Sequence, residues 1–155
     1  MKKWIAGLAL ATLSLGMAAN AQDEGPFGME IEARQGLMAY RAINIGTLAA
    51  MAKGEAEYDA AKAKVAADAL LASASLDQSM LWPAGSDNAA NPKSTAAAAI
   101  WADGSDIGDK SAAFTTAAQA MAAAAGTDLA SLQGAMDGLG ASCGGCHKAY
   151  RVPSN

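Results

Sequence analysis

Alanine supplies 42 of the 155 residues of this chain, and this excess constrains its fold more than any other feature. Alanine is the strongest helix former, but each alanine buries little apolar surface. The hydrophobic fraction of 52% therefore overstates the bulk available for a core, since only 5% of the residues are aromatic. The composition predicts a single all-helical domain that lacks large core side chains and would gain from a bound group in its middle.

Apolar residues recur at helical spacing in four segments separated by residues typical of helix ends. We predict helices at about 29–52, 58–73 and 110–125, and from Thr127 or Asp128 to Tyr150, with a short helical run at 95–101. The apolar stripe predicted for the second helix is Tyr58, Ala61, Val65, Ala69 and Ala72. Residues 74–109 form one long connection, whereas the other links are short. This order predicts an all-α fold, an antiparallel up-down-up-down four-helix bundle with a long loop between helices two and three.

The N-terminal residues have the three parts of a secretory signal peptide. These parts are Met1-Lys2-Lys3, the apolar run from Trp4 to about Met17, and Ala19-Asn20-Ala21. The alternative is a membrane anchor, but the apolar run is shorter than the roughly 20 residues that span a bilayer. We therefore expect cleavage after Ala21, with residues 22–155 forming a periplasmic domain that has no membrane span.

The charge balance excludes one class of partner. The formal net charge is −4 and the isoelectric point is about 4.8, which argues against nucleic-acid binding. The composition also excludes collagen-like, disulfide-dense and disordered chains.

The sharpest motif is Cys143-Gly144-Gly145-Cys146-His147, which uses both cysteines and the only histidine of the chain. Thiols three positions apart lie about one helical turn apart on one face, so they can add to the two vinyl groups of a haem. The adjacent imidazole can then bind the iron as its proximal ligand. The motif predicts one covalently bound haem c, with His147 as the metal ligand.

Three other interpretations of the motif fit the chain less well than haem. A thioredoxin-like redox pair would follow a strand, and this pair lies near the end of a helical chain. Zinc prefers four nitrogen or sulfur ligands, and only three such residues exist here outside methionine. A plain disulfide would leave the adjacent histidine without a role.

The position of the motif on the last helix resembles cytochrome c′, of the class II cytochromes c. The resemblance covers nearly all of residues 22–155. The residues that carry it are Arg34-Gln35-Gly36-Leu37-Met38, Tyr58-Asp59-Ala60, Trp82-Pro83, Ile100-Trp101, the haem motif, and Tyr150-Arg151.

The resemblance implies a five-coordinate iron whose open face is covered by Met38. Such a protein binds nitric oxide and carbon monoxide and changes oxidation state, with a redox protein that is not identified. The alternative is a six-coordinate, low-spin electron carrier in which the Met38 thioether is the sixth ligand, which would raise the reduction potential. A third interpretation is that Met38 only fills core volume.

The resemblance also implies roles for residues around the haem. It places Arg34 and Gln35 at the propionates, where an arginine can pair with a carboxylate in two-pronged geometry. It places Trp82 in the pocket wall and Arg151 beside the proximal histidine, one helical turn after His147. The alternatives for Arg34 and Arg151 are ordinary surface charges.

Two further expectations concern catalysis and assembly. We expect no enzymatic activity, because the sole histidine is proximal and no distal base is evident. The resemblance also implies a homodimer built through the first and second helices.

Overall fold

Four helices make up most of the chain in the computed structural model, which describes residues 25–153. They are α1 (Gly28–Ala52), α2 (Ala60–Ala74), α3 (Ile107–Ala124) and α4 (Leu129–Tyr150). Each helix packs against the next one in the chain, and α1 also packs against α4. The predicted four-helix bundle is therefore confirmed. The predicted signal peptide at residues 1–21 lies outside the described residues.

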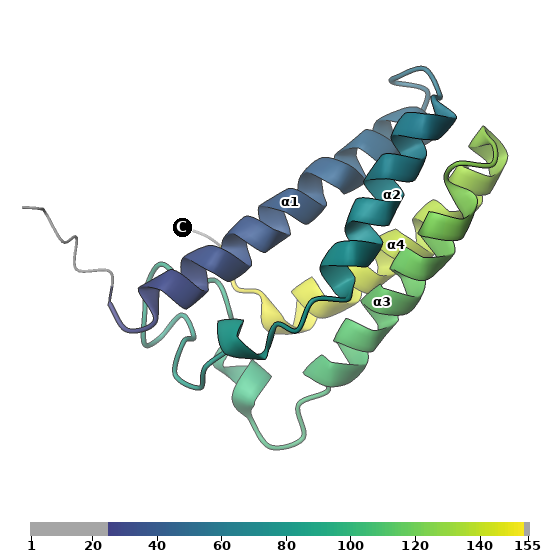
Figure 1. Ribbon diagram of the computed structural model, residues 1–155. Helices are drawn as coiled ribbons and strands as arrows, with labels where there is room; N and C mark the ends of the chain where they lie inside the picture. Colours follow the sequence, from purple (N-terminus) through teal and green to yellow (C-terminus); the bar gives the residue numbers. More distant parts are fainter. Residues whose placement is uncertain (1–24, 154–155) are drawn as a thin grey trace, which may run out of the picture.

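The two hairpins turn at the same end of the molecule, and the long connection between α2 and α3 lies at the opposite end (Figure 1). We call residues 75–106 the crossover segment. It contains two short 3-10 helices, Ser79–Leu81 and Ala98–Trp101, and the second lies within the run predicted to be helical. The crossover segment fills the end where α1 and α3 begin.

Side-chain caps explain where two of the helices begin. The side chain of Asp59 accepts a hydrogen bond from the backbone N–H of Lys62, so α2 begins two residues later than predicted. The side chain of Asp128 accepts one from the N–H of Ser131 at 2.7 Å, which fixes the start of α4 at the predicted cap. Between α1 and α2, Gly54 adopts φ +74°, a conformation that favours glycine after a helix.

The main core lies between the helices, toward the end at which the hairpins turn. Its largest members are Leu48, Met51, Leu70, Met121, Leu132 and Leu139. The apolar stripe predicted for α2 is wrong, because Val65 is 70% exposed and the buried face is Ala63, Ala66, Ala67 and Leu70. In a helix this rich in alanine, both faces are apolar, and periodicity alone does not identify the buried one.

The crossover segment is joined to the residues that end α4 and follow it. Ala96 and Arg151 form an isolated antiparallel bridge. The N–H of Ala97 donates to the carbonyl of Tyr150 at 2.9 Å, and the N–H of Val152 donates to the carbonyl of Thr95 at 2.9 Å. This short pairing fixes the crossover segment beside the C-terminal end of the haem-motif helix.

Within residues 25–153, none of the helices combines the length and the apolar character needed to cross a membrane.

Candidate haem site

A cavity of about 940 Å³ lies between α1, α3, α4 and the crossover segment. Its volume is at the upper end of the range of about 300–1,000 Å³ typical of small-molecule and cofactor sites. All of the predicted site residues line it, namely Arg34, Gln35, Met38, Trp82, Cys143, Cys146, His147 and Arg151. Residues from the start of α1, the crossover segment and the end of α4 are thus brought together at one place.

The two thiols of the motif lie on α4 and line the cavity together. Both are half-buried and free, so neither is used in a disulfide. Burial raises the pKa of Cys146, and the neighbouring Cys143 adds to this shift. Two reduced thiols one turn apart and an adjacent imidazole are the donor set that a covalent haem requires, and the cavity offers the space, so the residues fit this cofactor.

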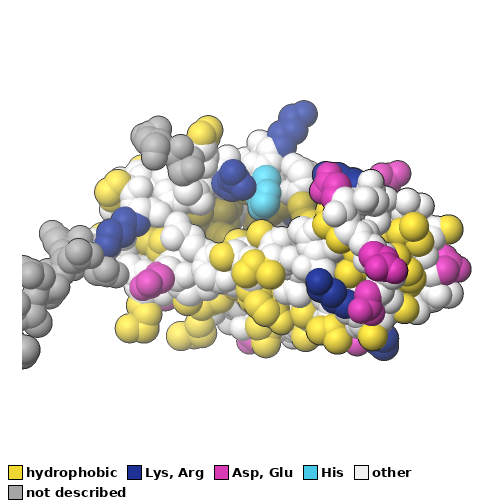
Figure 2. Space-filling model, turned by 90° about the horizontal axis from the view of Figure 1, so that it is seen from above, with side chains coloured by type: hydrophobic (Ala, Val, Ile, Leu, Met, Phe, Trp, Pro, Cys, Tyr) yellow, Lys and Arg dark blue, Asp and Glu magenta, His cyan; other side chains and the backbone are white. Residues whose placement is uncertain are grey.

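His147 is exposed and reachable from outside the bundle. Figure 2 shows the single histidine of the chain at the surface, next to a Lys or Arg side chain. Packing on one side lowers the pKa of His147, and the positive charge of Arg151 lowers it further. Both effects favour the neutral imidazole, which is the form that binds a metal.

Arg151 is the first residue after α4, not part of the helix. Its backbone is extended, with φ −111° and ψ 122°, and its N–H donates to the carbonyl of His147 at 3.1 Å. This hydrogen bond to the residue four positions earlier places Arg151 one helical turn along from His147, as expected, although its own backbone has left the helical conformation. Pairing with Ala96 in the crossover segment ends the helix before Arg151. Its role beside the histidine stays a prediction.

Arg34 is 4% exposed, and its guanidinium holds the crossover segment against α1. Nη1 donates to the carbonyl of Leu81 and to Oγ of Ser86, while Nη2 donates to the carbonyl of Ser86 and to Oγ of Ser94. The guanidinium also lies 4.7 Å from the ring centroid of Trp82, as in a cation–π contact. Burial lowers the pKa of Arg34. The propionate role of Arg34 stays a prediction, beside this structural role that the sequence did not indicate.

Gln35 and Trp82 also make contacts with the crossover segment. Nε2 of Gln35 donates to the carbonyl of Lys93 at 2.7 Å. The carbonyl of Trp82 accepts a hydrogen bond from Nε1 of Trp101 at 3.1 Å, and the two indole rings are 6.4 Å apart. The wall that the crossover segment contributes to the cavity is therefore held by side chains at several points.

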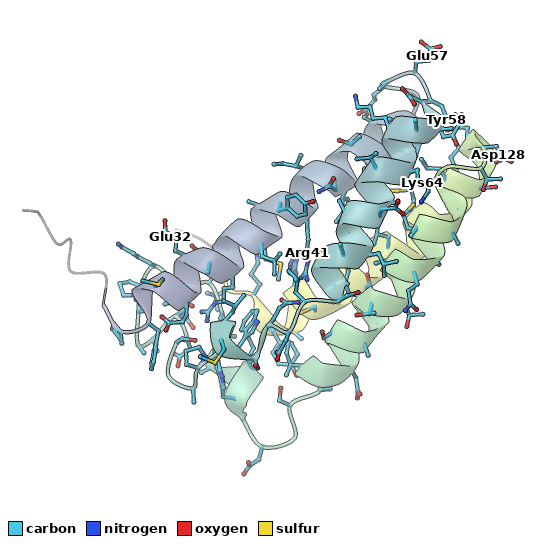
Figure 3. All side chains as sticks on the ribbon, in the orientation of Figure 1. Glu32, Arg41, Glu57, Tyr58, Lys64 and Asp128 are labelled. Carbon is cyan, nitrogen blue, oxygen red and sulfur yellow. The ribbon has the colours of Figure 1, made fainter. Side chains whose placement is uncertain are left out.

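Sequence reasoning missed Arg41, a second buried arginine that lines the cavity. Its side chain points from α1 toward the C-terminal end of α2 (Figure 3). There Nε donates to Oγ of Ser73 at 3.0 Å and Nη2 donates to the carbonyl of Ser73 at 2.8 Å. Nη1 lies 3.8 Å from Sδ of Met38, and the guanidinium lies 4.6 Å from the ring centroid of Phe114. The signal in the sequence was a charged residue within the apolar stripe of the first helix.

Comparisons with known proteins agree with this geometry. The family model described as Cytochrome C′ matches residues 29–151. Cytochrome c-554 of Cereibacter sphaeroides is 47% identical over 147 residues, which cover 95% of this chain and 96% of the relative. A solved structure of cytochrome c′ from Rhodobacter spheriodes superposes with a TM-score of 0.79 at 38% identity, covering 81% of this chain and 97% of that one.

A further solved structure carries a ligand. It is a variant of cytochrome c prime from Alcaligenes xylosoxidans with carbon monoxide bound, and it superposes with a TM-score of 0.69 at 30% identity. The match covers 80% of this chain and 94% of that one.

Proposed function

Because the chain belongs to the cytochrome c′ family, we propose that it is an exported haem c protein that changes oxidation state and binds nitric oxide or carbon monoxide. One observation carries this proposal. The thiols of Cys143 and Cys146 and the imidazole of His147 line one cavity with Met38 of the helix opposite.

The residues of the chain divide the task of holding the cofactor. Cys143 and Cys146 would tether it to α4, and His147 would supply the nitrogen ligand on one face. Arg34 and Gln35 would lie at its propionate edge, with Trp82 in the wall and Arg151 beside the histidine. When bound, the haem would supply a redox-active iron, and the imidazole of His147 would be its ligand from the protein.

The proposed iron is five-coordinate, with Met38 covering the open face. Support comes from the contact of the Met38 sulfur with Nη1 of Arg41 at 3.8 Å, which gives the thioether a partner within the protein. A diatomic gas would then need to displace a flexible side chain but not break a bond to sulfur. The relative with bound carbon monoxide supports gas binding in this family.

The second candidate is a six-coordinate electron carrier with Met38 as the sixth ligand. The observation in its favour is that a thioether lines the same cavity as the imidazole of His147, from the helix on the other side. Thioether sulfur is a competent haem ligand and would raise the reduction potential.

An absorption spectrum of the reduced protein, recorded before and after adding carbon monoxide, separates the two candidates. The proposal expects a high-spin spectrum that changes with the gas, both in the natural protein and in Met38→Leu. A low-spin spectrum that carbon monoxide leaves unchanged would refute it. If Met38→Leu then gained carbon monoxide binding, Met38 would be the sixth ligand.

Covalent attachment is tested separately, by the pyridine haemochrome of the purified protein. Variants that replace Cys143 and Cys146 together with serine should lose stable haem after acid–acetone extraction. A Ser142→Ala variant is the matched control, since it changes a neighbouring side chain of α4 and leaves both thiols in place. A normal haemochrome in the double cysteine variant would refute the thioether attachment.

We also propose that the protein acts in the periplasm, after cleavage following Ala21, and that it is a carrier and gas binder, not an enzyme. Mass spectrometry of protein from the periplasmic fraction should find Gln22 at the N-terminus. Peroxide turnover by the purified protein should not exceed that of free haem. An intact N-terminus, or rapid peroxide turnover, would contradict these statements.

A homodimer through α1 and α2 is the assembly that we propose. Support comes from large apolar side chains that are exposed on these helices, including Tyr40 and Ile43 of α1 and Val65 of α2. Stable interfaces bury about 1,200–2,000 Å² in total, and apolar contacts of this kind lie at their centre. Light scattering should give twice the chain mass, and Ile43→Asp should give the monomer. A monomeric natural protein would refute the dimer.

A further inference from the structure

The side chain of Arg41 is fixed at three sides and lies at the wall of the cavity. It is 8% exposed. Ser73 of α2 accepts hydrogen bonds from it through both its hydroxyl and its carbonyl oxygen, and Phe114 of α3 lies against its face. Oγ of Ser73 in turn donates to the carbonyl of Leu70 at 2.7 Å, so the anchor is itself held. The guanidinium therefore has little freedom to turn.

The fixed guanidinium leaves Nη1 directed at one group, the sulfur of Met38. Met38 and Arg41 are three residues apart on α1, so they are neighbours on one helical face. A cationic N–H donor attracts the sulfur lone pairs that a metal would otherwise receive, and it keeps the thioether on its own side of the cavity. Arg41 thus acts on the group that decides the coordination of the sixth position.

The position of Arg41 distinguishes it from Arg34. Arg34 binds oxygens of the crossover segment, whereas Arg41 binds Ser73 at the end of α2 and lies against Phe114 of α3. The two buried arginines therefore line different parts of the cavity wall.

A buried arginine is costly unless its charge is compensated. In the described part of the chain, the atoms that contact the Arg41 guanidinium belong to neutral groups, namely Ser73, Met38 and Phe114. A leucine at this place would pack against Phe114 without that cost. The arginine thus has a use that core packing alone does not supply.

We propose that Arg41 is a positioning residue that holds the thioether of Met38 away from the haem iron and so keeps the sixth position open. This inference rests on the haem site proposed above. In this proposal, the side chain of Arg41 determines whether the iron keeps an open position for a gas or binds the thioether of Met38.

The main test is Arg41→Lys in the haem-loaded protein. Lysine keeps the positive charge but has a single ammonium group, which cannot contact Ser73 twice and Met38 at once. The sulfur of Met38 is then free to bind iron. We expect a low-spin spectrum, a loss of carbon monoxide affinity of about tenfold or more, and a higher reduction potential, since thioether ligation raises the potential.

Two further variants separate positioning from a general effect on the fold. Ser73→Ala removes one anchor and should shift the spectrum in the same direction by a smaller amount. The double variant Arg41→Lys, Met38→Leu has no sulfur to release and should recover the high-spin spectrum and carbon monoxide binding. Lys62→Arg, an exchange of the same two residue types on the exposed side of α2, is the control and should change nothing.

The outcomes distinguish this inference from the proposed function. If the natural protein carries no covalent haem, both are overturned. If it carries haem and binds carbon monoxide, but Arg41→Lys behaves like the natural protein, only the role of Arg41 is refuted. A natural protein that is already low-spin would refute it as well, because the thioether would then not be held away. Loss of carbon monoxide binding that persists in the double variant would also refute it.

Discussion

Replacing Arg34 with methionine should destabilise the protein by about 3 kcal/mol, through loss of the contacts that hold the crossover segment. Four of its hydrogen bonds disappear, but not every acceptor is left without a partner. The carbonyl of Ser86 keeps the hydroxyl of Ser94 as a donor at 2.9 Å, and the carbonyl of Leu81 is only partly buried, so water can reach it.

The hydroxyl of Ser86 is the acceptor that loses most, because Ser86 is fully buried. A stranded buried hydroxyl costs about 1–3 kcal/mol. The lost cation–π contact with Trp82 adds about 1 kcal/mol. The loss of the other bonds is roughly offset by the relief of no longer burying a charge, so the total is about 3 kcal/mol. For a domain of this size, 3 kcal/mol corresponds to a fall in Tm of about 10 °C.

Urea unfolding of the haem-loaded protein, followed by far-ultraviolet circular dichroism, measures this loss, and hydrogen exchange locates it. Exchange should quicken at residues 81–97 and stay unchanged in the main core. Thr47→Ala is the control, since the hydrogen bond of its hydroxyl to the carbonyl of Ile43 is exposed and its removal should cost less than about 0.5 kcal/mol. A loss below about 1 kcal/mol for Arg34→Met, or unchanged exchange at residues 81–97, would refute the role of Arg34 in holding the crossover segment against α1.

Three other predictions concern the helices. Leu70→Ala empties a fully buried site and should cost about 3 kcal/mol in urea unfolding, and a cost below 1 kcal/mol would show that the buried face of α2 is assigned wrongly. Asp59→Ala removes the cap that binds the N–H of Lys62 and should cost about 1 kcal/mol, whereas Asp59→Asn should cost little. The hydroxyl of Tyr150 donates to Asp106 and is the largest cause of the lowered pKa of that carboxyl. The stability that this bond contributes is therefore present above the ordinary aspartate pKa of about 3.9 and is lost as the pH falls through the lowered value. Tyr150→Phe should be destabilising at pH 7, and the difference should shrink in acid; an equal difference at both pH values would contradict this linkage.

The haem motif was predictable because its information is local. Cys143, Cys146 and His147 lie within five residues of one helix, so their spacing fixes their relation whatever the rest of the bundle does. The helices themselves were predictable for a similar reason, since alanine-rich segments with clear end residues have no competing structure. The largest difference at a helix end is at α3, which begins at Ile107, three residues before the predicted start at Lys110.

The buried face of α2 and the contacts of the arginines were not predictable, because they depend on partners far away in the chain. Because alanine lies on both faces of α2, the sequence pattern does not show which face packs against α1 and α3. The oxygens bound by Arg34 are 47 to 60 residues further along, and those of Ser73 are 32 residues from Arg41. A lone sequence shows that such an arginine interrupts an apolar stripe, but it does not show which backbone oxygens will meet it.

The pairing of residues 95–97 with residues 150–152 has a consequence for the order in which the molecule can be assembled. When the chain is synthesised from its N-terminus, α1, α2 and the crossover segment are made before residues 150–152, with which that segment pairs. This backbone pairing can form only after the whole of α4, which carries both thiols, has been made. The wall of the cavity that carries both thiols is therefore the last part of the bundle that can pack against its neighbours.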